Sequence, residues 1–215
     1  KHFREHGVIK AIMNRFDVQI ITEALKVQAM FSVIAIANLS CEYEAVVEML
    51  NHDFFQKYCE LVQYKISIIS CAVIQALTNV FILCVDAPKK LQKLAYNAID
   101  MVTVLLANIR TPLNSDNQLF AVGCLGRILA SRAGQDEDLR KKLCNHGALG
   151  LLTQLIAVGA AANETLREYA LTCIAQLLNC KTKPTVVEIT TALKKSKCQE
   201  DKNYLQSILN NLKQL

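Results

Sequence analysis

Histidine and cysteine are the residues of this chain with the most recognisable chemistry, but their spacing completes neither a catalytic nor a metal site. His2 and His6 are four residues apart, as two ligands on one helix face would be, yet Phe3 stands where a zinc protease carries its glutamate. Cys144 and His146 form a Cys-x-His pair without a second pair of ligands in sequence, and a structural zinc site needs both pairs. His146 repeats the position of His6, so capping of a helix end explains both histidines. The sequence therefore predicts no metal and no cofactor.

Signatures of other enzyme classes are missing as well. The glycine patterns of dinucleotide-binding folds, P-loop proteins and serine hydrolases do not occur. The closely spaced carboxylates Glu42, Glu44 and Glu48 fit the solvated face of a helix. We therefore expect a chain that is not an enzyme.

The cysteines indicate a reducing compartment. There are nine of them, an odd number with no Cys-x-x-Cys pair, and Cys71 and Cys84 lie among apolar neighbours as buried free thiols do. We expect a cytoplasmic or nuclear location. The sequence starts at Lys1 without the apolar start of a signal peptide, which we interpret as an excised piece of a larger protein.

Composition favours a helical fold. Of 215 residues, 52% are apolar and 20% charged, which excludes a disordered chain. Seven glycines and three prolines are too few for the turns of a many-stranded sheet, so long helices with short links are expected. The net charge of +5 lies mostly in residues 181–215, which leaves the rest nearly neutral and does not favour a nucleic-acid surface. A lesser alternative is nucleic-acid contact through Lys194, Lys195 and Lys197.

Residues 66–85 are uncharged and long enough to cross a membrane. Polar side chains interrupt this segment near one helical stripe: Ser67, Ser70, Gln75, Thr78 and Asn79. We expect a core helix with one face open to water or a partner, not a membrane span.

Two series of markers indicate an internal repeat. Long apolar segments end in similar sequences around positions 38, 79, 127 and 176, at intervals of 41, 48 and 49 residues. A second series at 7, 53, 97 and 147 precedes shorter apolar runs, at intervals of 46, 44 and 50. Gly7 and Gly147 belong to this series and are expected to adopt the left-handed conformation that follows many helix ends.

Each repeat is predicted to contain a short, a medium and a long helix, which in the last repeat cover residues 136–145, 148–157 and 164–178. In the preceding repeat, residues 115–117 are expected to cap a long helix over 118–130. The predicted repeats are residues 1–40, 41–85, 86–131 and 132–180, followed by capping helices in 181–215.

These three-helix units, with their glycine after the first helix and the ending Ala37-Asn38-Leu39-Ser40, resemble the armadillo repeat of the β-catenin and importin-α superfamily. The related HEAT repeat, with two helices a unit, stays an alternative. The resemblance implies a right-handed α-solenoid whose third helices line a concave groove for extended peptides. It also implies that an asparagine near the end of each third helix bonds the peptide backbone. Asn38 and Asn79 match that asparagine, whereas Arg127 and Gln176 replace it.

The tryptophan that importin-α carries one turn earlier is missing. Ile34, Gln75, Gly123 and Thr172 stand there instead. An amide side chain can pair with the N–H and C=O groups of an extended peptide whatever the family. Residues further back along the long helices make the predicted groove apolar, unlike the acidic groove that a basic peptide requires. The full set of expected groove residues is Phe31, Ile34, Asn38, Gln75, Asn79, Arg127, Tyr169, Thr172 and Gln176.

Structural roles compete with these assignments. Asn38 and Asn79 could instead bond a neighbouring repeat, and Phe31 and Phe120 could pack in the core. Gly123 and Gly126 in one helix indicate close approach by another backbone or by a partner. Arg127 follows them, and we expect it to meet an acidic side chain of the partner.

The leading hypothesis is a non-catalytic interaction module within a larger scaffold or adaptor, which binds an extended or helical segment of a partner protein along its groove. The alternative is a regulatory or dimerisation solenoid that packs through its ends or its convex face.

Overall fold

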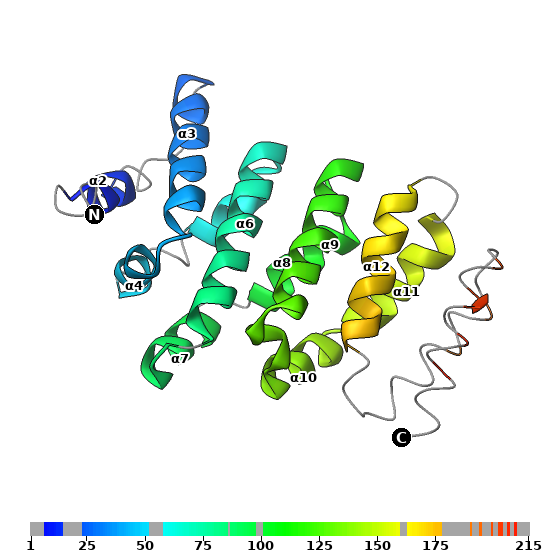
Figure 1. The fold of residues 1–215 in the computed structure, drawn as a ribbon. Coiled ribbons are helices and arrows are strands. Elements are labelled where there is room, and N and C mark those ends of the chain that lie inside the picture. The colour runs from blue at the N-terminus through cyan, green and yellow to red at the C-terminus, as the bar shows by residue number, and fades with distance from the viewer. Residues whose placement is uncertain are drawn as a thin grey trace. The chain divides into compact units, whose positions relative to one another are not determined.

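The computed structural model describes residues 7–14, 23–51, 58–85, 87–97, 101–159 and 163–177, and seven single positions between 190 and 209. Over these residues the fold is all-α, as predicted: every regular element is an α-helix or a short 3-10 helix (Figure 1). The chain divides into two compact units, residues 1–104 and 105–215, and the boundary falls inside α8 (Met101–Arg110).

Unit 1 is built around two long neighbouring helices, α3 and α6, which pack against each other (Figure 1). Helix α2 contacts α3 and α4, and α7 contacts α4 and α6. The elements of unit 1 ahead of α8 are α2 (Val8–Asn14), α3 (Glu23–Leu39), α4 (Tyr43–Asn51), η2 (Leu61–Tyr64), α6 (Ser67–Cys84) and α7 (Lys89–Asn97).

Helix α6 is the core helix of unit 1. By length and hydropathy it could cross a membrane, and so could α3 and α4 if that sharply bent pair were one span. However, 67% of the α6 segment is buried inside the fold, as in the core helix predicted from the sequence. The polar stripe expected to face outward does so only in part, because Ser70, Thr78 and Asn79 are buried, whereas Ser67 and Gln75 are half-buried. Thr78 Oγ1 donates to the Ile74 carbonyl oxygen at 2.8 Å, so its hydroxyl is satisfied within the helix.

Tyr58 connects the two long helices of unit 1. Its side chain is fully buried, and its hydroxyl lies 3.0 Å from the Val33 carbonyl oxygen on α3 and 3.3 Å from that of Ala72 on α6. Burial raises the pKa of this phenol well above its ordinary value, with a smaller contribution from Cys59. No local pattern in the sequence indicates this contact.

Unit 2 is built around the pair α9 and α12. Helix α12 packs against α9 and α11, and α10 packs against α11 and η3. The elements that follow α8 are α9 (Ser115–Ala130), η3 (Arg132–Gln135), α10 (Glu137–Asn145), α11 (Ala148–Gly159) and α12 (Glu164–Leu177). The last three match the short, medium and long helices predicted for the last repeat, within two residues at each end.

Side-chain caps decide where the helices of unit 2 begin. Asn114 caps α9, since its Oδ1 accepts the Asn117 N–H at 2.8 Å, so residues 115–117 form the first helical turn. The prediction that these residues are the cap was therefore wrong, because the carboxamide of Asn114 already accepts one of the N–H groups that the first turn leaves free. Asn163 caps α12 in the same way and accepts the Leu166 N–H at 3.0 Å.

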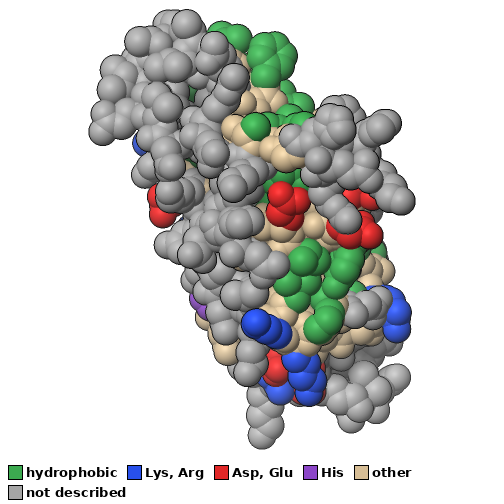
Figure 2. Space-filling model, turned by 90° about the vertical axis from the view of Figure 1, so that its left-hand side faces the viewer, with side chains coloured by type: hydrophobic (Ala, Val, Ile, Leu, Met, Phe, Trp, Pro, Cys, Tyr) green, Lys and Arg blue, Asp and Glu red, His purple; other side chains and the backbone are tan. Residues whose placement is uncertain are grey.

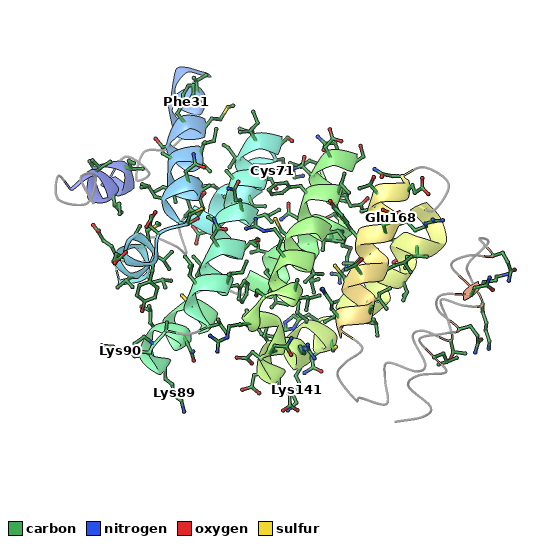
Figure 3. The ribbon with its side chains drawn as sticks, in the orientation of Figure 1. Phe31, Cys71, Lys89, Lys90, Lys141 and Glu168 are labelled. Carbon is green, nitrogen blue, oxygen red and sulfur yellow. The ribbon has the colours of Figure 1, made fainter. Side chains whose placement is uncertain are left out.

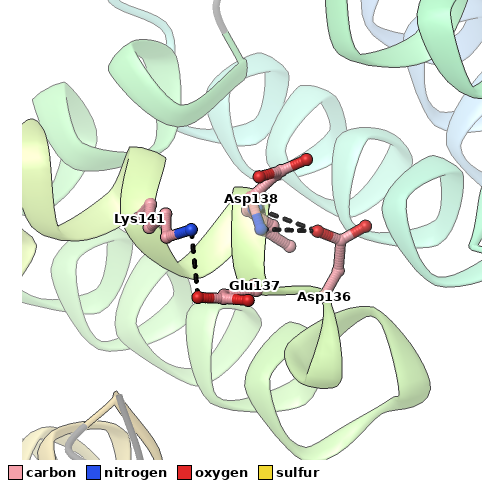
Figure 4. Close-up of polar contacts among 5 residues, drawn as sticks. Asp136, Glu137, Asp138 and Lys141 are labelled. Atoms are coloured by element: carbon pink, nitrogen blue, oxygen red, sulfur yellow. Dashed lines mark hydrogen bonds and ion pairs between the residues drawn. The ribbon is translucent and has the colours of Figure 1, made fainter. Parts of the chain in front are cut away.

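The acidic start of α10 acts as the sequence predicts. Asp136 Oδ1 accepts the N–H groups of Asp138 and Leu139 at 2.8 and 3.1 Å, and the Glu137 and Lys141 side chains pair at 3.0 Å (Figure 4). Negative side chains at the start of α10 and Lys142 in its last turn complement the helix dipole.

Gly7 and Gly147 confirm the predicted left-handed conformation, with φ of 63° and 79°. Gly147 follows α10, where His146 Nδ1 lies 2.8 Å from the Lys142 carbonyl oxygen, so this histidine caps the helix end as expected. His2 and His6 lie outside the described residues.

The predicted repeat boundaries and the C-terminal cap stay predictions. Of the tail, the structure describes only single positions; Lys194 is exposed and Leu209 is buried. The other residues assigned to the cap or to nucleic-acid contact, including Lys195 and Lys197, lie outside the described part of the chain.

Candidate functional site

A cleft of about 460 Å³ opens between α9 and α12 in unit 2. Four residues expected in the groove from the sequence alone line it together: Arg127, Tyr169, Thr172 and Gln176. Phe120, Gly123 and Gly126, which the sequence analysis also singled out, complete much of its wall.

The two helices that form the cleft run in the same direction. A Cβ atom built on Gly123 would lie 3.4 Å from Tyr169 Cε2, and one built on Gly126 would lie 3.5 Å from Cys173 Sγ. Because both contacts advance along both helices together, the C-terminal ends of α9 and α12 lie at the same end of the cleft. Arg127 and Gln176 are therefore neighbours at one end, and Phe120 and Tyr169 lie toward the other.

The cleft is mainly apolar, with a few polar groups. Tyr169 is 45% exposed and Phe120 is half-buried. Thr172 Oγ1 donates to the carbonyl oxygen of Glu168 on its own helix at 2.9 Å, so it can offer a ligand its methyl group and a hydrogen-bond acceptor but no donor. Glu168 lies in the first half of α12 (Figure 3).

Gln176 carries an unsatisfied acceptor. Its Oε1 is buried, and no donor of the described residues lies within hydrogen-bond distance. A buried acceptor without a partner destabilises a protein by about 1–3 kcal/mol, so such atoms are uncommon in folded proteins. Arg127, one turn before the end of the opposite helix, is exposed and cationic. This end of the cleft can therefore attract a negative charge, and it can accept an N–H group once the Gln176 side chain turns toward the cleft.

In unit 1, the predicted groove residues of α3 form an exposed apolar stripe. Phe31 is 70% exposed and Ile34 is 37% exposed, so neither packs in the core. Val27 on α3 and Ile68 on α6 are exposed too. Phe31 lies near the middle of α3, and the half-buried Cys71 lies in the first half of α6 (Figure 3).

The polar predictions in unit 1 have different outcomes. Asn38 is exposed near the end of α3, and Gln75 is half-buried on α6. Asn79 is only 6% exposed, and its Nδ2 donates to Ser40 Oγ at 3.0 Å and lies 3.3 Å from Cys41 Sγ. The competing role stated for it, bonding to the preceding repeat, is the one that these contacts describe. Asn79 therefore holds the long helices of unit 1 together.

The surface of the molecule on the side of α2 and α4 has a mixed character. Figure 2 shows a group of hydrophobic side chains there between acidic and basic ones. At the start of α7, Lys89 and Lys90 point away from the helices (Figure 3). No broad surface of one charge is visible on this side among the residues that the structure describes.

Three further residues of the cleft were not in the predicted set: Leu119, Cys124 and Ala130. Leu119 lies two turns before Arg127 on α9, and Ala130 lies one turn after it. Helical spacing from Arg127 would have found both. Cys124 is buried and was predicted only as one of the free thiols.

No disulfide joins the cysteines of the described residues. Cys59, Cys84 and Cys173 are buried, and burial raises the pKa of Cys84 to about 11 and that of Cys173 to about 12. Burial, and to a smaller extent Glu60, raises the pKa of Cys59 further. These thiols are therefore protonated and unreactive at neutral pH. Within the described ranges, no three His, Cys, Asp or Glu side chains gather as metal ligands would.

Solved structures similar to this chain include designed armadillo repeat proteins. A designed armadillo repeat protein matches 98% of this chain and 84% of its own, with a TM-score of 0.68 and 17% identity. A second, solved in complex with the peptide (KR)4, has the same TM-score and coverage at 16% identity. An engineered protein covers 96% of this chain and 83% of its own, with a TM-score of 0.63 and 20% identity. No protein-family model and no curated protein matches the sequence.

Proposed function

We propose, from the armadillo-repeat fold of this chain, that it is a non-catalytic interaction module of a larger scaffold or adaptor. Its ligand is a segment of a partner protein, which lies in extended form along the exposed faces of the long helices. The single observation that carries the proposal is the cleft between α9 and α12, which gathers Arg127, Tyr169, Thr172 and Gln176. The free buried thiols support a reducing location, in the cytoplasm or the nucleus.

Backbone recognition is assigned to Gln176. An extended segment presents unpaired N–H and C=O groups along its length, and a carboxamide can pair with both. Gln176 lines the cleft, and its Oε1 is buried and unsatisfied in the unbound chain, so a turn of this side chain toward the ligand brings the acceptor to one of those N–H groups. Binding would remove an unfavourable feature of the unbound chain, and this would favour the complex.

Charge selection is assigned to Arg127. One of the similar designed proteins is in complex with a basic peptide, which supports peptide binding as a use of this fold. The exposed Arg127 at the cleft would repel such a peptide, and its planar guanidinium suits a carboxylate. We therefore propose that the segment recognised here is acidic at this point.

In unit 1, apolar contact is assigned to Phe31 and Ile34, with amide contact from Asn38 and Gln75. Both apolar side chains are exposed on α3, as contact residues must be. Asn79 is left out of this set because its amide already bonds Ser40.

The test is selection from a random-peptide library on the immobilised chain, followed by dissociation constants for the selected peptides. Arg127→Glu should weaken binding at least about tenfold, or about 1.4 kcal/mol. Arg132→Glu is the matched control, because Arg132 is exposed on η3 and does not line the cleft. Equal loss in both variants would indicate only a general charge effect, and unchanged binding in both would exclude the cleft.

Sedimentation of the unbound chain addresses the alternative of self-association. If no peptide is selected and the chain forms a concentration-dependent dimer that Phe31→Ser dissolves, the exposed stripe on α3 is a dimer interface instead.

A further inference from the structure

We propose that Gly123 and Gly126 of α9 form an anchor subsite, which admits one apolar side chain of the partner segment and thereby determines which segments bind. This inference rests on the proposed peptide-binding function and adds the chemistry of the ligand. The ligand is an extended segment in which an apolar side chain of phenylalanine or leucine size adjoins an acidic residue.

Two glycines within one turn are unfavourable in a long helix. Glycine lacks a side chain to restrict the unfolded chain and is a much poorer helix former than alanine. Helix α9 nevertheless continues from Ser115 to Ala130, and neither glycine has the positive φ that would require one. The helix therefore has no conformational need of glycine at either position.

Packing does not require the glycines either. The nearest atoms to a Cβ on Gly123 belong to the ring of Tyr169, at 3.4 and 3.6 Å, and the nearest atom to one on Gly126 is Cys173 Sγ at 3.5 Å. These are ordinary van der Waals distances to side chains, not clashes with a backbone. The sequence analysis left two explanations for the glycines: close approach of another backbone, or contact with a partner. The backbone of α12 does not approach them, so the first explanation is wrong for this helix. The second explanation, contact with a partner, is the one that we pursue.

Gly134 shows what a structurally required glycine looks like in the same unit. A Cβ there would lie 1.9 Å from the Leu129 carbonyl oxygen, so backbone packing forbids any side chain. Gly123 and Gly126 differ from it in that both line the cleft, and a Cβ at either position would touch only side chains of α12.

The surroundings of this space define what enters it. Phe120 and Tyr169 provide aromatic surface at one side, and Leu119 and Cys124 are apolar. An apolar side chain is the group that this lining stabilises on burial. Arg127 lies next to Gly126, and Gln176 lies one turn beyond Thr172. A carboxylate beside the anchor therefore meets Arg127, and a backbone N–H beside it meets Gln176 once that side chain turns toward the cleft.

Defined probes test the subsite directly. N-acetyl-Phe-Glu-amide, N-acetyl-Phe-Lys-amide and N-acetyl-Ala-Glu-amide would be titrated into the isotope-labelled chain, with the backbone amides of Gly123 and Gly126 observed by NMR. We expect the Phe-Glu probe to shift both signals and to bind at least about fivefold more tightly than either of the others. Equal binding of all three, or no shift at the two glycines with Phe-Glu, would overturn the inference.

The double variant Gly123→Ala/Gly126→Ala tests the role of the space itself. It should fold with an unfolding temperature no lower than that of the unchanged chain, because alanine fits both positions and favours the helix. Its affinity for the Phe-Glu probe, and for library peptides, should fall at least about tenfold. Gln154→Ala on the exposed face of α11 is the control for a helix-stabilising change away from the cleft. A lower unfolding temperature of the double variant would show that packing needs the glycines, and the inference would be wrong.

The outcomes separate this inference from the function on which it rests. If library peptides bind the unchanged chain and the double alanine variant equally, peptide recognition stands and the anchor subsite is rejected. If no probe and no library peptide binds the unchanged chain, both the function and the subsite are rejected.

Discussion

Asn79 Nδ2 lies 3.0 Å from Ser40 Oγ, which joins the second half of the core helix α6 to the residue that follows α3. Ser40 in turn donates to the Ala37 carbonyl oxygen at 2.6 Å, so the amide, the hydroxyl and the end of α3 form one buried chain of hydrogen bonds. The asparagine that the resemblance assigns to a ligand is used here for cohesion between helices.

Asn79→Ala is accordingly a stability variant. Removing the amide leaves the buried Ser40 hydroxyl without its donor, and we expect the free energy of unfolding to fall by about 1–3 kcal/mol. Urea denaturation followed by circular dichroism measures this. Asn38→Ala is the matched control, because Asn38 is exposed and should change stability by less than about 0.5 kcal/mol. Peptide affinity that falls in Asn79→Ala without a loss of stability would contradict this assignment.

Tyr58→Phe tests the second connection between α3 and α6. The ring stays and fills the same space, so the change removes only a hydroxyl that lies near two carbonyl oxygens. We expect a loss of about 1 kcal/mol, since both carbonyl groups belong to helices and keep their backbone partners. Tyr43→Phe, at an exposed tyrosine of α4, should leave the urea midpoint unchanged. A similar loss in both variants would mean that the hydroxyl of Tyr58 has no special role.

Local features of the fold could be predicted from the sequence, and contacts between distant residues could not. Gly147 has its left-handed φ because of the helix that ends just before it, so neighbouring residues suffice to predict it. The start of α9 was misplaced because Asn114, Ser115, Asp116 and Asn117 are all capping types, and only the backbone path decides which of them bonds. The hydroxyl contacts of Tyr58 reach 25 residues back along the chain, and no local pattern signals them.

The site was predictable only in part, because a position along a helix is a local feature and its exposure depends on distant residues. The repeat spacing aligned Arg127 with Gln176, and both line the cleft. It also aligned Asn79 with them, yet Asn79 is buried against Ser40. Sequence alignment of repeats gives a position along a helix, but the tilt and rotation of each helix decide whether that position is exposed. Glycine spacing indicated a special region of α9, and only the structure shows that both glycines line a cleft and that alanine fits beside Tyr169 and Cys173.

The same substitution should have opposite effects at two glycines of unit 2. Gly126→Ala should raise the free energy of unfolding by about 0.5–1 kcal/mol, because the helix gains and Cys173 Sγ leaves room. Gly134→Ala should lower it by about 1–3 kcal/mol, because the new Cβ overlaps the Leu129 carbonyl oxygen and the backbone must move. Thermal unfolding of the two variants beside the unchanged chain measures both signs. Destabilisation by both would mean that α12 cannot tolerate a side chain at position 126.

Stability should fall at alkaline pH because of the buried thiols. Burial raises the folded-state pKa of Cys84 to about 11 and that of Cys173 to about 12, whereas a thiol in the unfolded chain titrates near its ordinary value of 9. Above that value the unfolded state binds fewer protons than the folded state, so the free energy of unfolding decreases as pH rises. The contribution is complete below about pH 9 and is lost as the pH rises from there toward 11 or 12.

The slope of the free energy of unfolding against pH, compared between variants, separates these thiols from other groups that titrate in the same range. Each fully shifted thiol contributes up to about 1.4 kcal/mol per pH unit, so Cys173→Ala should make the decline shallower by about that amount. Urea denaturation with a reductant at about pH 7.5, 9 and 10.5 measures the slope. Cys41→Ala, at an exposed thiol, is the matched control and should follow the unchanged chain. If Cys173→Ala has the slope of Cys41→Ala, the thiol of Cys173 reaches water in the folded state, and α12 does not pack on α9 as closely as its distance to Gly126 indicates.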